Sequence, residues 1–214
     1  MSLPAYAELH CLSSFSFLRG ASQPQELAER AEALGYAALA LTDECSVAGV
    51  VRAHTALKGH RTRLIVGSEF RLDCGLPLIV LAADRRGYGQ LCRLITRARR
   101  AAPKGCYALQ RVDVETILEP GHCLVLWAPR PAQLREITHA RADALWLQRY
   151  FAGAAWIAVE LLRDGTERAH LALLQSLGAQ SGLPLVAAGG VCMHVRARRR
   201  LHDALTAIRL NTTL

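Results

Sequence analysis

Side chains able to bind metal or exchange protons follow the ends of the predicted strands. Six of them share this position: His10, Asp43, Glu44, Glu69, Cys192 and His194. In a barrel of parallel strands, the reactive groups collect at the carboxyl ends of the strands. Singly, His10 could be a hydrogen-bonded rim histidine, Asp43 a helix cap and Glu69 an arginine partner. Their joint placement favours a functional site made of titratable groups.

The elements that would position these groups alternate along the whole chain, as short apolar segments and amphipathic helices. One predicted helix starts near Ser22, where Ser22 and Gln25 are expected to form a capping box, and it ends at Gly35. Short apolar strands separated by helices favour parallel pairing with both faces of the sheet covered. Six or seven such units, without a glycine-rich dinucleotide motif after the first strand, favour an α/β barrel over an open sheet.

The composition of the 214 residues, 51% of them apolar, is that of a globular protein with a sizeable core. No apolar run approaches the roughly 18 to 20 residues that a membrane span needs, and Met1 to Pro4 is too short for a signal peptide. We therefore expect a cytoplasmic protein with no membrane partner. The seven cysteines are scattered without a Cys-x-x-Cys pair, which argues against a disulfide framework or a zinc ribbon.

The net charge of +8 indicates an acidic partner, and nucleic acid is the commonest one. Two segments concentrate this charge, "RLITRARR" and "HVRARRR", with Arg93, Arg97, Arg99, Arg100, Arg196, Arg198, Arg199 and Arg200. Arginine binds phosphate through a bidentate fork, so both segments are candidates for contact with phosphate or nucleic acid. The alternative is two solvated helix faces in a chain that uses arginine in place of lysine.

Five ordered segments carry a resemblance to a known family: "AELHCLSSFSFLRGAS", "ALALTDECSVAGVVRAH", "LIVGSEF", "PLIVLAADRRGYGQLCRLIT" and "LPLVAAGGVCMHVRARRRLHDALTAIR". Together they resemble the N-terminal polymerase and histidinol phosphatase (PHP) domain of bacterial C-family DNA polymerases. The first two are most similar to the error-prone alpha subunits, which serve damage-induced mutagenesis, DNA repair and translesion synthesis. The resemblance implies one domain over residues 1–214, a distorted (β/α)7-type PHP barrel with parallel strands and outer helices.

The resemblance also implies partners: the remainder of the polymerase alpha subunit, DNA, a sliding clamp and accessory mutagenesis factors. Whether the chain is an excised domain or a truncated gene product stays open. Polymerisation by this chain alone is not expected, because the acidic residues of a polymerase palm are absent from it.

PHP domains hold up to three metal ions with nine ligands, and only part of that set is kept. His10, Asp43 and Glu69 match family ligands, and Glu44 stands where a histidine belongs. Other ligand positions carry substitutes: Leu12, Arg19, Pro77, Gly190 and Cys192, with Cys123 near a further one. We therefore expect a degenerate site with no cofactor, in which Arg19 pairs with Glu44 or Glu69. A residual zinc or manganese site of His10, Asp43, Glu44, Glu69 and Cys192 is the alternative.

Three functions compete on this evidence. The first is a non-catalytic PHP domain that serves as a structural platform for the polymerase core. The second is an active metal-dependent phosphoesterase or 3′-5′ exonuclease, against which the missing ligands argue. The third is a free-standing nucleic-acid-binding protein, whose DNA affinity would depend steeply on salt.

Overall fold

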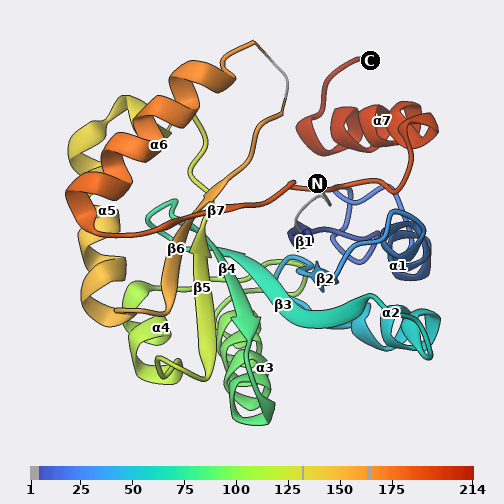
Figure 1. Ribbon diagram of the computed structural model, residues 1–214, viewed down its shortest axis with the longest axis horizontal. Coiled ribbons are helices and arrows are strands. Elements are labelled where there is room, and N and C mark those ends of the chain that lie inside the picture. The colour runs from blue at the N-terminus through green and yellow to red at the C-terminus, as the bar shows by residue number, and fades with distance from the viewer. Residues whose placement is uncertain (1–4, 132, 163–164) are drawn as a thin grey trace. The chain divides into compact units, whose positions relative to one another are not determined.

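The computed structural model describes residues 5–131, 133–162 and 165–214 (Figure 1). The chain forms two compact units, the first made of the residues up to Ser68 together with Gly190–Leu214, and the second of Glu69–Gly189. The long strand β3 (Arg63–Arg71) passes from one unit into the other.

The first unit contains β1 (Ala7–Cys11), β2 (Ala38–Leu41) and most of β3, with its helices α1 (Pro24–Ala33), α2 (Val50–Leu57) and α7 (Arg199–Leu210) and a 3-10 turn at Arg196–Arg198. β1 pairs with β2, and β2 with β3, in parallel, as the sequence pattern predicts. A buried apolar cluster joins the strands to α1 and α2: Cys11, Leu27, Ala28, Ala31, Leu39, Leu41, Ala53 and Leu57.

The start of α1 lies one residue later than the sequence indicates. Gln23 is the N-cap and forms the capping box with Glu26, while Pro24 is the first helical residue. The predicted box of Ser22 and Gln25 is therefore wrong by one position. Proline fits the first turn because its missing N–H would have no helical partner there.

The second unit contains β4 (Pro77–Ala82), β5 (Cys123–Trp127), β6 (Ala155–Val159) and β7 (Leu185–Ala187), with the helices α3 (Arg85–Arg100), α4 (Arg111–Ile117), α5 (Ile137–Tyr150) and α6 (Glu167–Ser181) and a 3-10 turn at Gln133–Arg135. α3 packs on β4 and β5, and α5 packs beside α6 (Figure 1). The fully buried side chains Leu78, Leu91, Val125 and Ile157 belong to its core.

Strand direction departs from the expected all-parallel arrangement at β4. β5, β6 and β7 are parallel, but β4 runs antiparallel to β5. Only five residues separate Arg71 at the end of β3 from Pro77 at the start of β4. A parallel crossover needs a dozen or more residues, so a connection of this length reverses the chain. The mixed α/β class and the outer helices are confirmed, while the parallel pairing holds for the other observed pairs only.

Among the described residues, no helix is long and apolar enough to cross a membrane.

Candidate functional site

Asp43, just after β2, is the centre of a buried hydrogen-bond network. Its Oδ1 accepts from the Ser13 backbone N–H at 2.8 Å and from the Ser16 hydroxyl at 2.7 Å, and its Oδ2 accepts from the Ser13 hydroxyl at 2.7 Å. The side chain is 1% exposed, and this burial raises the pKa of Asp43 while the serine hydrogen bonds oppose the rise. Asp43 holds the loop that follows β1, rather than capping the helix that follows β2.

The loop itself, residues 12–22, turns back sharply on its own backbone. The Ser16 hydroxyl oxygen also accepts from the Glu44 backbone N–H at 2.9 Å, and Leu18 has a left-handed φ of 58°. A Cβ at Gly20 would lie 1.9 Å from the Ser13 carbonyl oxygen. Only glycine permits this approach of two backbone segments.

An ion pair joins this loop to the residue that follows Asp43. Arg19 Nη1 lies 2.7 Å from Glu44 Oε2, and the two side chains are 16% and 29% exposed. The expected pairing of Arg19 with Glu44 is confirmed. The guanidinium therefore stands against the carboxylate that the residual metal site would require.

The remaining strand-end residues lie on both units. In the first unit, β1 has one more residue than β2 between the pairs Glu8 to Leu39 and Cys11 to Leu41, and this bulge contains His10, which is buried. Cys192 lies in the same unit, with its Sγ 3.6 Å from the Gly190 carbonyl oxygen. Glu69 is buried on the part of β3 that belongs to the second unit.

His194, the other candidate near Cys192, has a structural contact that the sequence does not reveal. Its Nδ1 lies 2.7 Å from the Ser22 hydroxyl, which also accepts from the His194 backbone N–H at 3.0 Å. Because Ser22 is buried just before α1, these contacts fasten the segment after β7 to the start of α1. A serine and a histidine that lie 172 positions apart in the sequence give no local signal from which to predict this contact.

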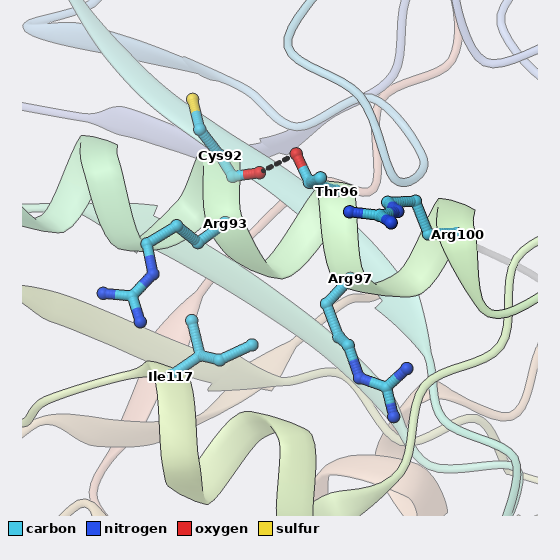
Figure 2. Close-up of a pocket in the computed structure, with 6 residues that line it drawn as sticks. All are labelled: Cys92, Arg93, Thr96, Arg97, Arg100 and Ile117. Carbon is cyan, nitrogen blue, oxygen red and sulfur yellow. Dashed lines mark hydrogen bonds between the residues drawn. The ribbon is translucent and has the colours of Figure 1, made fainter.

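The first arginine cluster lines a groove on the second unit (Figure 2). The groove has a volume of about 590 Å³ and is lined by Cys92, Arg93, Thr96, Arg97, Arg100 and Ile117. Arg97 Nε lies 2.8 Å from Asp113 Oδ1 on α4. Arg99, the fourth predicted member, does not line the groove, because its guanidinium lies over the Tyr107 ring at 5.4 Å from the centroid.

The second arginine cluster is engaged within the first unit. Arg198 pairs with Glu26 at 2.6 Å, and Arg199 lies 3.5 Å from Asp203 one helical turn away. Arg196 and Arg200 are exposed. These four residues do not share one groove lining, so the structure does not assemble them as it does the α3 arginines.

Comparison with known proteins shows which family has this sequence. The model of the PHP domain family matches residues 8–180. The chain therefore belongs to the PHP domain family. It is 58% identical over 217 residues to the error-prone DNA polymerase of Dechloromonas aromatica (strain RCB), covering 100% of this chain and 20% of that protein. With the error-prone DNA polymerase of Methylococcus capsulatus it shares 54% identity, over 98% of this chain and 19% of that protein. The chain thus spans about a fifth of these relatives.

Two solved structures share the fold of this PHP domain. A protein from Bifidobacterium adolescentis, described as a metal-dependent phosphoesterase, has a TM-score of 0.56 and 14% identity, covering 95% of this chain and 98% of that one. An amidohydrolase from Chromobacterium violaceum, solved with bound sulfate and no metal, has a TM-score of 0.56 and 18% identity, covering 94% and 97%. The likeness confirms the expected PHP-type fold.

The residues present in this PHP domain do not fit a multinuclear metal centre. Leu12 is buried and apolar, Arg19 is cationic and paired, and Gly190 has no side chain. Asp43 already accepts three hydrogen bonds from Ser13 and Ser16. Within the part of the chain that the structure describes, no three His, Cys, Asp or Glu side chains are grouped so that they could hold a metal ion.

The two looser positions of the family pattern also have structural surroundings. Pro77 is the first residue of β4, and Cys123 is the first residue of β5. Cys123 is buried with its Sγ 3.4 Å from the Gly87 carbonyl oxygen, and burial raises its pKa to about 11. The Cys123 thiol therefore donates to the backbone of α3 within the core of the second unit.

Proposed function

We propose that this chain is the PHP domain of an error-prone DNA polymerase and that it acts as a structural platform for the polymerase core. The identity to error-prone polymerases over the whole chain supports the assignment. Its expected roles in damage-induced mutagenesis, repair and translesion synthesis, in the cytoplasm, belong to this proposal. So do the remainder of the alpha subunit, the clamp and the accessory factors as partners.

One observation carries the platform role. Where the family pattern places metal ligands, Arg19 pairs with Glu44 and Asp43 accepts hydrogen bonds from Ser13 and Ser16. A trinuclear centre brings up to six positive charges and needs anionic ligands, so a guanidinium at this place opposes metal binding. The same contacts stabilise the loop after β1, which is what a platform requires.

The hydrolytic alternative is tested directly on the 214-residue chain. We expect no hydrolysis of p-nitrophenyl phosphate, and none of a 3′-labelled single-stranded oligonucleotide, above the background of a His10→Ala, Glu69→Ala variant purified in parallel. Manganese and zinc are each supplied, and bound metal is measured by plasma mass spectrometry. A metal-dependent rate that co-purifies with the chain and disappears on Glu69→Ala would contradict the platform role.

The platform role itself is tested in the longer polymerase. Primer extension should survive Glu44→Gln, which removes a ligand candidate, and should fall with Gly20→Ala, which disrupts the fold of the loop. Loss of primer extension with Glu44→Gln in a protein of unchanged melting temperature would show that the site has chemistry of its own.

A further inference from the structure

The groove between α3 and α4 presents a row of guanidinium groups on one helix face. Arg93, Arg97 and Arg100 follow one another at steps of four and three residues, which brings them to the same side of α3. Figure 2 shows Arg93 and Arg97 reaching from α3 toward the side of Ile117 on α4, while the guanidinium of Arg100, on the next turn, lies along α3 toward Thr96. All three are exposed.

Two of these arginines have their charge available. Arg97 is held by Asp113, which also accepts from the Gln110 backbone N–H at the start of α4. Arg93 and Arg100 have no ion pair among the described residues. The groove therefore combines one arginine that ties α3 to α4 with two that face solvent and have their charge available to an anionic ligand.

A purely structural reading explains only part of this row. Cations in the last turn of a helix interact favourably with its dipole, which accounts for Arg97 and Arg100. Arg93 lies two turns before the end of α3, beyond the reach of that effect. A solvated helix face would also not need the concave floor that α4 provides.

The spacing matches a phosphate backbone. With a rise of about 1.5 Å per residue, seven residues separate Arg93 from Arg100 by about 10 Å along the helix axis. Phosphates of one B-form strand rise by about 3.4 Å each along the duplex axis, so the row matches the axial rise across four consecutive phosphates when α3 lies along that axis. Arginine can also bind each phosphate through two parallel hydrogen bonds.

The rest of the lining favours binding without base recognition. The Thr96 hydroxyl donates to the Cys92 carbonyl oxygen at 2.8 Å, and Ile117 gives the floor an apolar surface against which a sugar can pack. Among the described residues, no asparagine, glutamine or carboxylate side chain, which also read base edges, lines the groove, and the Thr96 hydroxyl is already used within α3.

We propose that the α3–α4 groove binds the phosphodiester backbone of DNA independently of base sequence, through Arg93 and Arg100 with Arg97 positioned between them. This inference rests on the proposed function, in which the chain is part of a protein that works on DNA.

The test compares two double variants of the 214-residue chain that remove the same charge. Arg93→Ala, Arg100→Ala removes the solvent-facing arginines of the groove. Arg141→Ala, Arg168→Ala removes two exposed arginines from α5 and α6 of the same unit. The affinity for fluorescein-labelled DNA, single-stranded and duplex, each in two unrelated sequences, is measured by anisotropy between 50 and 200 mM salt.

The groove variant should bind both sequences about tenfold more weakly or worse, with a log-affinity against log-salt slope shallower by about 2. The α5 and α6 variant should stay within about twofold of wild type. Comparable melting temperatures for all three proteins exclude unfolding as the cause. Equal weakening by both double variants, or by neither, overturns the groove as the site.

Two further outcomes separate this proposal from its neighbours. An acidic peptide of the same charge that binds more tightly than DNA, with the same dependence on Arg93 and Arg100, would make the groove a protein-docking site and the proposal wrong. The groove variant could instead bind DNA as tightly as wild type while primer extension by the longer polymerase still falls with Gly20→Ala. That outcome would contradict the groove proposal and leave the platform role standing.

Discussion

The loop after β1 and the α3–α4 groove both concentrate polar residues, but they use them in opposite ways. At the loop, the carboxylate of Asp43 accepts hydrogen bonds from Ser13 and Ser16, and the carboxylate of Glu44 pairs with Arg19. In the groove, Arg93 and Arg100 have no ion pair among the described residues. Polar groups satisfied internally stabilise a fold, whereas exposed charges of one sign leave their interaction energy for a ligand. Changes in the loop should therefore alter stability, and changes in the groove should alter binding.

The largest expected effect is that of Gly20→Ala. The added Cβ would lie 1.9 Å from the Ser13 carbonyl oxygen, so the loop after β1 must shift. We expect a loss of about 3 kcal/mol in the free energy of unfolding, measured by urea denaturation. The matched control is Gly89→Ala in the interior of α3, where a Cβ meets nothing within 4 Å. It should stabilise by about 0.5 to 1 kcal/mol through helix propensity. Equal effects of the two substitutions would contradict the rigid loop.

Asp43→Ala should have the next largest effect. It leaves the buried Ser13 N–H and the two serine hydroxyls without their acceptor, and unsatisfied buried donors cost about 1 to 3 kcal/mol. We expect a loss of about 2 to 3 kcal/mol in denaturant unfolding without added metal. Asp43→Asn keeps one acceptor oxygen and should lose less. An Asp43→Ala variant as stable as wild type in the presence of chelator would mean that the carboxylate has no structural role.

Much of this loop could be anticipated from the sequence, and the groove only in part. The alternation of apolar segments and helices predicts the α/β class. The family pattern predicts Glu44 or Glu69 as the partner of Arg19, and the structure pairs Arg19 with Glu44. The sequence also contains a sign of the reversal of β4, since no helix separates "RLIVGSEF" from "LPLIVLAAD". The expectation of parallel pairing for all strands does not take this short connection into account. The hydrogen bonds between Asp43 and the serines could not be predicted from the sequence. They join residues about 30 positions apart, and their geometry depends on the bulge in β1 and on the turn of the loop that follows it.

For the arginine clusters, too, the sequence predicts local arrangement but not contacts with other elements. Their spacing predicts which residues share a helix face, and it selects Arg93, Arg97 and Arg100 from the first cluster. Arg99 contacts the Tyr107 ring and Arg198 pairs with Glu26, so neither guanidinium is available to a ligand. Both partners lie outside the arginine's own helix or turn, where the spacing of the arginines gives no sign of them. Charge along the sequence therefore overestimates the number of arginines available to a ligand.

Arg19→Ala should cost about 1 kcal/mol, because partial exposure screens its ion pair with Glu44. Double-mutant analysis with Glu44→Ala isolates the pairwise energy from other losses. We expect a coupling of about 0.5 to 1 kcal/mol that shrinks at high salt. A coupling near zero at low salt would show that the loop does not depend on this pair and would weaken the argument against metal binding.

The smallest effect concerns the pH dependence of stability. The hydrogen bond from the Gln23 backbone N–H, followed by the contact with Arg198, lowers the pKa of Glu26 below its ordinary 4.5. Between the folded and unfolded pKa values the unfolded chain binds more protons, so stability falls as the pH falls through this range. Glu26→Gln should therefore flatten the acid limb of urea stability below about pH 4.5, relative to Glu29→Gln on the same helix. An unchanged acid limb in Glu26→Gln would mean that the capping carboxylate and its arginine contribute nothing to the first unit, and that Arg198 is as available to an anion as Arg93.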